Sequence, residues 1–173
     1  MRAPSQWEIW RRIMAKNKCN VVETVHAPSL HRNNMKTVLS LGSNLGDRDF
    51  YLAAARQLLE LRVGEPTRLS PVIETKSWGY DSHDYLNQVV EYETELEPME
   101  LLRVLKEIEV ALGRPAESKT KPGTQDYKDR TIDIDILYYE DVEMNTPELT
   151  IPHPRIQERP FILDLLDKLK VEN

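Results

Sequence analysis

The stretch over residues 129–139 limits the possible folds more than any other part of the chain, because polar and apolar side chains alternate strictly over 131–136 within it. The apolar positions of the alternation are Ile132, Ile134 and Ile136. The polar positions beside them are Thr131, Asp133 and Asp135. Since strict alternation over this length is typical of a β-strand, the stretch predicts a strand over 131–139 with an apolar face and an acidic face.

The two aspartates of this strand are candidate metal ligands. Successive residues on one face of a strand lie about 6.5–7 Å apart, so the carboxylates of Asp133 and Asp135 can share a pair of hard cations, which prefer oxygen ligands. Paired cations of this kind hold a phosphoryl group during displacement reactions, and Arg130 stands just ahead of the strand, within reach of a phosphate. Taken alone, the pattern favours a plain amphipathic strand whose acidic face is solvated.

Composition narrows the classes of protein to which the chain can belong. Its 173 residues have the length of one domain. The single cysteine, Cys19, cannot form an internal disulfide, which indicates a reducing compartment. No apolar run reaches the roughly 18 residues that a membrane span requires. The net charge of −6 argues against general nucleic-acid binding.

Residues 1–34 differ from the rest of the chain in charge and in pattern. They are basic, whereas the remainder is acidic, and they lack strand alternation. Met35 directly precedes the first clear strand. We therefore expect a domain over 35–173, preceded by an N-terminal extension over 1–34 that is dispensable or poorly ordered.

The domain is expected to alternate strands with helices. The predicted strands cover 37–41, 68–75, 85–93 and 131–139, and the predicted helices cover 48–62, 98–112 and 161–170. Asp47 suits the N-cap of the first helix, Pro98 suits the first turn of the second, and Gly113 suits the position after its end. The order β-α-β-β-α-β predicts the ferredoxin-like α+β fold, an antiparallel sheet with helices packed on it.

Five short motifs follow one another along this domain. They are Leu41-Gly42-Ser43-Asn44-Leu45-Gly46, Tyr85-Leu86-Asn87, Ile108-Glu109 with Gly113-Arg114, Asp129 through Leu137, and Ile151-Pro152-His153-Pro154 with Arg159 and Phe161. In this order and spacing they resemble the 6-hydroxymethyl-7,8-dihydropterin pyrophosphokinase family of folate biosynthesis. The resemblance implies transfer of the β,γ-diphosphoryl group of ATP to the hydroxymethyl group of the pterin, which gives AMP and the pterin diphosphate.

The resemblance also implies roles for single residues. Asp133 and Asp135 would bind two Mg²⁺ ions. Arg114 and Arg130 would be catalytic and neutralise charge as the bridge between the α- and β-phosphates breaks. The residues implied for pterin binding are Thr75, Asn87, Tyr127 and Phe161. The residues implied for ATP binding are Lys106, Glu109, Thr150, His153 and Arg159.

The residue types agree with this chemistry. Phosphoryl-type transfer asks the protein mainly for positioning and charge stabilisation, and guanidinium groups can bond phosphate oxygens in pairs, which an ammonium group cannot. We therefore expect ATP as co-substrate, Mg²⁺ as cofactor and the pterin as second substrate. We also expect a cytoplasmic monomer that binds neither nucleic acid nor membrane.

Two other classes of protein share the predicted topology. A non-catalytic or decayed ferredoxin-like binding module would have lost an arginine or an aspartate of the site, and none is lost. An RNA-binding domain would display aromatic side chains on its central strands and a basic face, whereas this domain is acidic. The binding module stays open as the alternative function.

Overall fold

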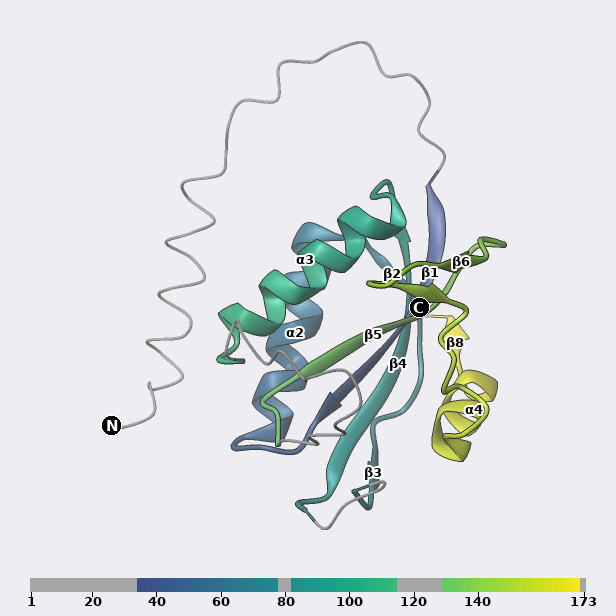
Figure 1. Cartoon of the computed structure of the whole chain (residues 1–173). Helices are drawn as coiled ribbons and strands as arrows, with labels where there is room; N and C mark the ends of the chain where they lie inside the picture. Colours follow the sequence, from purple (N-terminus) through teal and green to yellow (C-terminus); the bar gives the residue numbers. More distant parts are fainter. Residues whose placement is uncertain (1–33, 78–81, 115–128, 172–173) are drawn as a thin grey trace.

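The structure, a computed structural model, describes residues 34–77, 82–114 and 129–171 (Figure 1). Its main sheet is antiparallel, with the strand order β5-β1-β4-β2-β8 and with β3 paired to β4. The strands of this sheet are β1 (Met35–Ser43), β2 (Pro66–Leu69), β3 (Ile73–Thr75), β4 (Tyr85–Thr94), β5 (Asp133–Tyr139) and β8 (Lys170–Val171). A separate hairpin pairs β6 (Met144–Asn145) with β7 (Thr150–Ile151).

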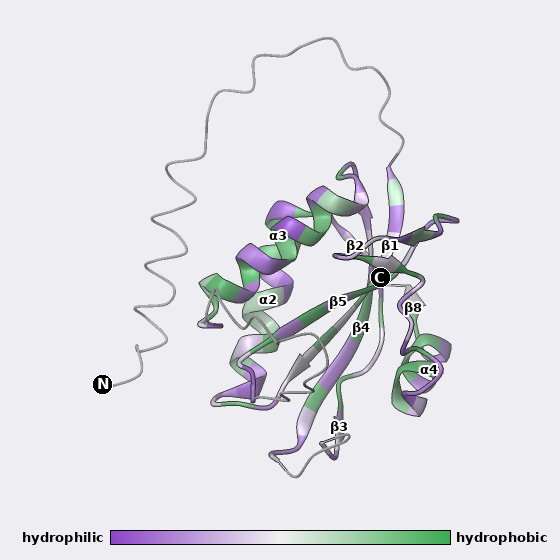
Figure 2. Ribbon diagram, viewed as in Figure 1, coloured by the Kyte–Doolittle hydropathy of each residue, from purple (hydrophilic) through white to green (hydrophobic). Residues whose placement is uncertain are grey.

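The sheet separates two apolar clusters. Helices α2 (Arg48–Arg62) and α3 (Pro98–Ala111) cover one face, and the short helix α4 (Pro160–Asp167) lies on the other (Figures 1 and 2). The cluster under α2 and α3 includes Leu39, Leu41, Ile132, Ile134 and Ile136. The smaller cluster under α4 consists of Val89, Leu137, Ile156, Ile162 and Leu165. Because α4 is short, part of its face of the sheet is left for polar side chains.

The predicted ferredoxin-like α+β fold is confirmed, but the predicted strand over 68–75 is wrong as a single element. Residues 70–72 separate β2 from β3, and only two residues of β4 lie opposite these three. The extra residue and Pro71, which has no N–H to donate, prevent a continuous ladder. The hydroxyl of Ser70 replaces the missing partner by accepting a hydrogen bond of 2.9 Å from the Val89 amide.

The two longer helices begin where the sequence predicts. The Asp47 carboxylate caps α2 by accepting a 3.0 Å hydrogen bond from the Phe50 amide. Helix α3 begins at Pro98, and Gly113 follows its end with φ +100°, a backbone conformation that favours glycine. The strands β6, β7 and β8 are two residues each, too short for a sequence pattern to reveal. No helix in the described ranges is long and apolar enough to cross a membrane.

Candidate active site

The central strand β1 supplies both the main core and the site, because its side chains alternate between the two faces of the sheet. Leu39 and Leu41 are fully buried under α2 and α3. Ser40 and Gly42 lie on the opposite face. Ser40 pairs in register with Asp135 of β5, and Gly42 is flanked by Asp133 of β5 and by the β4 residue at position 87. Three strands therefore place their polar residues side by side.

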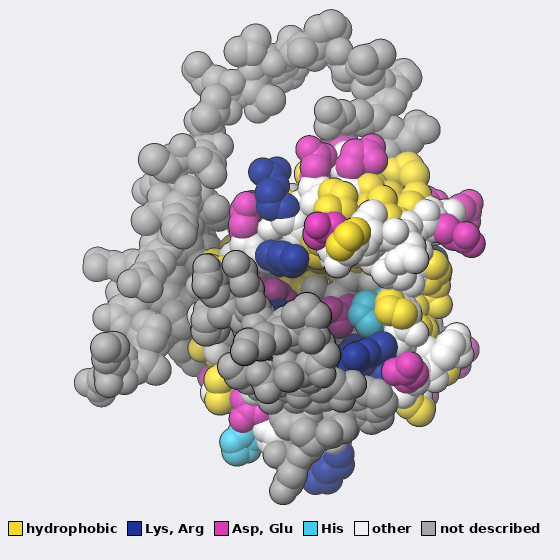
Figure 3. Space-filling view, viewed as in Figure 1, with side chains coloured by type: hydrophobic (Ala, Val, Ile, Leu, Met, Phe, Trp, Pro, Cys, Tyr) yellow, Lys and Arg dark blue, Asp and Glu magenta, His cyan; other side chains and the backbone are white. Residues whose placement is uncertain are grey.

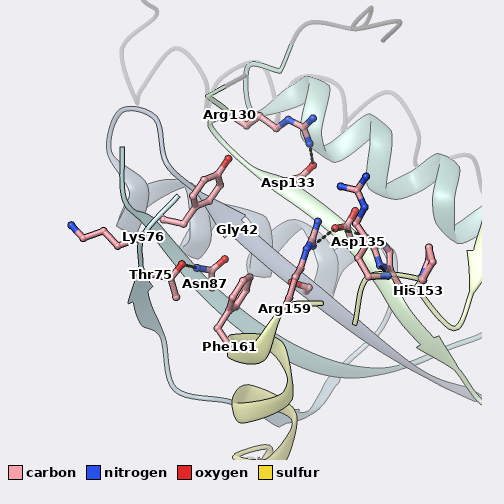
Figure 4. Close-up of a pocket in the computed structure, with 14 residues that line it drawn as sticks. Gly42, Thr75, Lys76, Asn87, Arg130, Asp133, Asp135, His153, Arg159 and Phe161 are labelled. Atoms are coloured by element: carbon pink, nitrogen blue, oxygen red, sulfur yellow. Dashed lines mark hydrogen bonds and ion pairs between the residues drawn. The ribbon is translucent and has the colours of Figure 1, made fainter. Parts of the chain in front are cut away.

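A pocket of about 320 Å³ opens on this face, beside the start of α4 (Figure 4). It is lined by Ser40, Gly42, Thr75, Lys76, Tyr85, Asn87, Arg130, Asp133, Asp135, His153, Pro154, Arg155, Arg159 and Phe161. On the surface seen in Figure 3, basic, acidic and histidine side chains lie next to one another. The lining thus combines an apolar, amide-bearing end with a highly charged end.

Asp133 lies at the centre of the charged end and contacts two arginines. Its Oδ1 atom is 2.9 Å from Nη1 of Arg114 and 2.7 Å from Nη1 of Arg130. The guanidinium groups come from different places, one just beyond α3 and one just before β5. All three side chains keep 20–27% of their surface exposed, and two of them, Arg130 and Asp133, line the pocket.

Glu109 supports this group from behind the strand, on α3. It is 6% exposed. Its Oε1 accepts a 2.8 Å hydrogen bond from the Ile134 amide, and its Oε2 lies 2.5 Å from Nη1 of Arg114. Burial first, and the nearby charge of Asp133 second, raise the pKa of Glu109 to about 7 even though Arg114 opposes the shift. The same two causes, burial and Asp133, raise the pKa of Asp135.

The raised pKa of Glu109 leads to a prediction for stability. Without divalent cations, the free energy of unfolding should fall as pH rises from about 4.5 to about 7, because the folded protein binds the proton more tightly than the unfolded chain does. The loss amounts to about 3 kcal/mol. Urea unfolding at pH 5 to 8 checks this, with Glu109→Gln expected to show a shallower decline. An equal decline in the variant would rule out Glu109 as the source.

Asp135 contacts a second pair of basic side chains. Its Oδ2 atom is 3.3 Å from Nη1 of Arg159 and 3.8 Å from Nε2 of His153. The Nδ1 atom of His153 accepts a 3.1 Å hydrogen bond from the Arg155 amide, so the neutral ring carries its proton on Nε2. Burial lowers the pKa of His153 despite the opposing charge of Asp135. The ring therefore presents an N–H donor to the pocket at neutral pH.

The opposite end of the pocket is less charged. The Asn87 amide nitrogen donates a 2.8 Å hydrogen bond to the Thr75 hydroxyl, and Phe161 stands beside them at the start of α4 (Figure 4). A Cβ atom on Gly42 would lie 3.2 Å from Oδ1 of Asn87 and 3.6 Å from the Tyr85 ring. The bare backbone at Gly42 therefore keeps the space between the two ends of the pocket open.

The structure brings together most, but not all, of the residues that the sequence assigns to the site. Those in the pocket lining are Thr75, Asn87, Arg130, Asp133, Asp135, His153, Arg159 and Phe161. Glu109 and Arg114 stand behind the lining. Lys106 is exposed on α3 and is not among the lining residues. Thr150 lies in the hairpin, where its hydroxyl is 3.3 Å from Oδ1 of Asn145. Tyr127 lies outside the described residues.

Six lining residues were not assigned to the site by the sequence analysis: Ser40, Gly42, Lys76, Tyr85, Pro154 and Arg155. Period-two alternation could have indicated three of them, because the residues at 40 and 42 alternate with buried leucines and residue 85 shares a strand face with 87. The other three lie one or two positions after predicted site residues along the chain, and residue type alone gives no further signal for them.

The carboxylates of the pocket suit a metal ion that completes its coordination with ligands from the substrate. Among residues 34–77, 82–114 and 129–171, no three His, Cys, Asp or Glu side chains are placed to hold a metal ion by themselves. Mg²⁺ is usually bound by one or two carboxylates together with substrate phosphates. Asp133 and Asp135 match that pattern. Burial first, and repulsion from Asp133 second, raise the pKa of Asp135, and a cation between the two carboxylates would relieve that repulsion.

Comparisons with known proteins point in one direction. Residues 38–171 match the family described as 7,8-dihydro-6-hydroxymethylpterin-pyrophosphokinase. The 2-amino-4-hydroxy-6-hydroxymethyldihydropteridine pyrophosphokinase of Porphyromonas gingivalis is 45% identical over 126 residues, which cover 72% of this chain and 83% of that protein. The Bacillus subtilis protein of the same name is 41% identical over 127 residues, which cover 72% of each.

Solved structures agree on the fold. The wild-type HPPK-DHPS of Plasmodium falciparum superposes with a TM-score of 0.62 at 16% sequence identity. The match covers 82% of this chain but only 40% of that longer one. Because the sequence identity is low, this similarity supports the fold and nothing further.

Proposed function

This chain belongs to the 7,8-dihydro-6-hydroxymethylpterin-pyrophosphokinase family, and we propose on that basis how its pocket transfers diphosphate from ATP to 6-hydroxymethyl-7,8-dihydropterin. The products are AMP and the pterin diphosphate, which serves folate biosynthesis. The observation that carries the proposal is that one pocket joins an amide and an aromatic ring to two carboxylates and several guanidinium groups. The alternative of a non-catalytic binding module is not favoured, because no charged group that the transfer requires is missing.

The pterin is proposed to occupy the less charged end of the pocket. Since the Asn87 amide nitrogen bonds to Thr75, its Oδ1 atom is left to accept a hydrogen bond from the pterin edge. Phe161 is suited to stack on one face of the pterin ring. Tyr127 as the aromatic residue on the second face stays a prediction.

ATP is proposed to occupy the charged end with two Mg²⁺ ions held by Asp133 and Asp135. Bound there, the ions would polarise phosphoryl oxygens and orient the triphosphate. Arg159 and the Nε2–H of His153 are placed to bond phosphate oxygens. The roles of Lys106 and Thr150 in ATP binding stay predictions.

Arg114 and Arg130 are proposed as the catalytic residues. Both guanidinium groups meet at Asp133, so both can reach charge that develops between the α- and β-phosphates. Preformed donors aimed at developing charge give larger effects in a pocket than in water.

Release of AMP tests the proposed function directly. AMP should appear only when ATP, Mg²⁺ and 6-hydroxymethyl-7,8-dihydropterin are all present, in equal amount to the pterin diphosphate. Formation of ADP, or AMP release that does not depend on the pterin, would contradict a pyrophosphokinase. Retention of labelled pterin without any AMP would instead support the binding module.

The domain boundary is a further prediction. A chain that begins at Met35 should keep the melting temperature of the whole protein within a few degrees and keep its turnover, because β1 and its pairing with β4 begin at that residue. Calorimetry and the AMP assay on both chains check this. A large drop in either quantity would mean that the extension over 1–34 supports the domain. The monomeric state and cytoplasmic location stay predictions, and size-exclusion chromatography of the same samples tests the former.

A further inference from the structure

Asn44, directly after β1, clamps the backbone that leads into β5. Its side chain donates a 2.8 Å hydrogen bond from Nδ2 to Oδ1 of Asp129, and its Oδ1 accepts a 2.8 Å hydrogen bond from the Arg130 amide. Its own amide donates to the Arg130 carbonyl at 3.1 Å. Asn44 is 1% exposed, whereas its partners Asp129 and Arg130 are half-buried. The backbone of Arg130 is thus held at both its N–H and its C=O.

A third segment joins the same place. The Ser82 hydroxyl, from the residues that precede β4, donates a hydrogen bond to the same Oδ1 of Asp129. We call Asn44, Ser82, Asp129 and Arg130 the Asn44 junction. It ties together the ends of the three strands that carry the pocket, β1, β4 and β5.

The junction replaces sheet pairing where that pairing has stopped. The ladder between β1 and β5 ends at the pair Gly42 and Asp133. Arg130 lies three residues before that point, yet its guanidinium reaches back to Asp133 at 2.7 Å. A long side chain on a loose backbone would sample many positions, so its aim depends on what fixes its backbone.

We propose that Asn44 is a positioning residue for the transfer reaction, which holds the backbone of Arg130 so that the guanidinium points into the pocket. The inference rests on the proposed role of Arg130 in catalysis. Asparagine suits the task because one short side chain has to accept from the Arg130 amide and donate to Asp129 at once. An aspartate at 44 could still accept from Arg130, but it would set two carboxylates against each other.

The test exchanges the two partners. Asn44→Asp is expected to lower kcat about 10- to 100-fold, because small misplacements of a catalytic group have effects of this size. Dissociation constants for the pterin and for a non-hydrolysable ATP analogue should change less than about threefold. The double variant Asn44→Asp with Asp129→Asn restores one donor and one acceptor, so it should recover at least half of the lost kcat on a logarithmic scale.

A readout independent of activity separates this proposal from the proposed function. The NMR order parameter of the Arg130 side-chain Nε–H should fall in Asn44→Asp and recover in the double variant. Asn34→Asp, an exposed change of the same chemistry before β1, is the control and should alter neither quantity. If the wild type released no AMP, the proposed function would fail while the order parameter still decided the positioning role.

Three results would overturn the proposal: an unchanged kcat and order parameter in Asn44→Asp, a double variant no better than the single one, or a defect confined to substrate affinity. If Asn44→Asp does not fold, Asp129→Ala takes its place. This variant removes the acceptor of the Asn44 side-chain Nδ2 but leaves the hydrogen bond from the Arg130 amide to Asn44 Oδ1. About a 10-fold loss of kcat is therefore expected. An unchanged kcat would contradict the proposal.

Discussion

Replacing Asp133 or Asp135 by alanine is expected to lower the rate of diphosphate transfer at least about 10³-fold, even with saturating ATP and pterin. Lewis-acid stabilisation of phosphoryl charge contributes several kcal/mol to the transition state, and each 1.4 kcal/mol or so is a factor of ten in rate. The two carboxylates lie on one face of β5, and among the residues that the structure describes no third carboxylate lines the pocket to replace them.

The fold should survive both substitutions. After burial, the charge of Asp133 is the second cause that raises the pKa of Glu109 and of Asp135, so removing Asp133 relieves repulsion that offsets its lost contacts with the arginines. We expect melting temperatures within about 5 °C of the wild type, which corresponds to roughly 1–2 kcal/mol. Asp141→Ala, an exposed aspartate two residues after β5, is the control for the loss of one negative charge. Normal turnover by either pocket variant at millimolar Mg²⁺ would contradict the proposed two-metal site.

Replacing Arg130 by alanine should lower kcat about 10²–10³-fold, the usual effect of removing one donor from developing charge. The dissociation constant of ATP should change far less, because Arg159 and His153, the residues proposed to bond the phosphate oxygens, remain in place. Arg130 lies 2.7 Å from Asp133, the carboxylate proposed to hold a metal ion at the reacting phosphates. The stabilisation that Arg130 provides should therefore grow as the bridge between the α- and β-phosphates breaks.

Two further variants sharpen this result. Arg130→Lys keeps the charge but loses the planar pair of donors, so it should recover only part of the rate. Arg103→Ala removes an exposed arginine from α3 and should leave kcat unchanged. Single-turnover measurement of AMP release, paired with titration of an ATP analogue, separates rate from affinity. An Arg130→Ala defect that appears only in ATP affinity would remove this residue from the transition state.

Local pattern was enough to predict the part of the site that lies on strands. The alternation of isoleucine and aspartate along β5 places Ile134 in the core and both aspartates in the pocket, as the structure shows. The element order was enough for the fold, because few topologies suit β-α-β-β-α-β. The break between β2 and β3 was harder, since Pro71 signals a disturbance without saying whether the strand bends or ends.

Contacts between distant segments could not be read from the sequence. Glu109 reads as an ordinary helix carboxylate, and its bond to the Ile134 amide spans 25 positions. Asn44 and Arg130 are 86 positions apart and meet only once the strands have paired. Likewise, the resemblance implies a role for Lys106 by its position alone, but the direction of its side chain depends on how α3 packs on the sheet.

Strand β1 contributes side chains both to the main core and to the pocket, and this constrains its length more strictly than its composition. Leu39 and Leu41 could be exchanged for other apolar residues, and Ser40 for another small one, with local effects. Inserting or deleting one residue inside the strand would instead turn leucines toward the pocket and polar residues into the core at the same time. Around this strand, insertions and deletions in relatives of this protein should therefore occur only in the turn after Asn44 or in the segment before Met35. A change of one residue within β1 would move every side chain beyond it to the wrong face of the sheet.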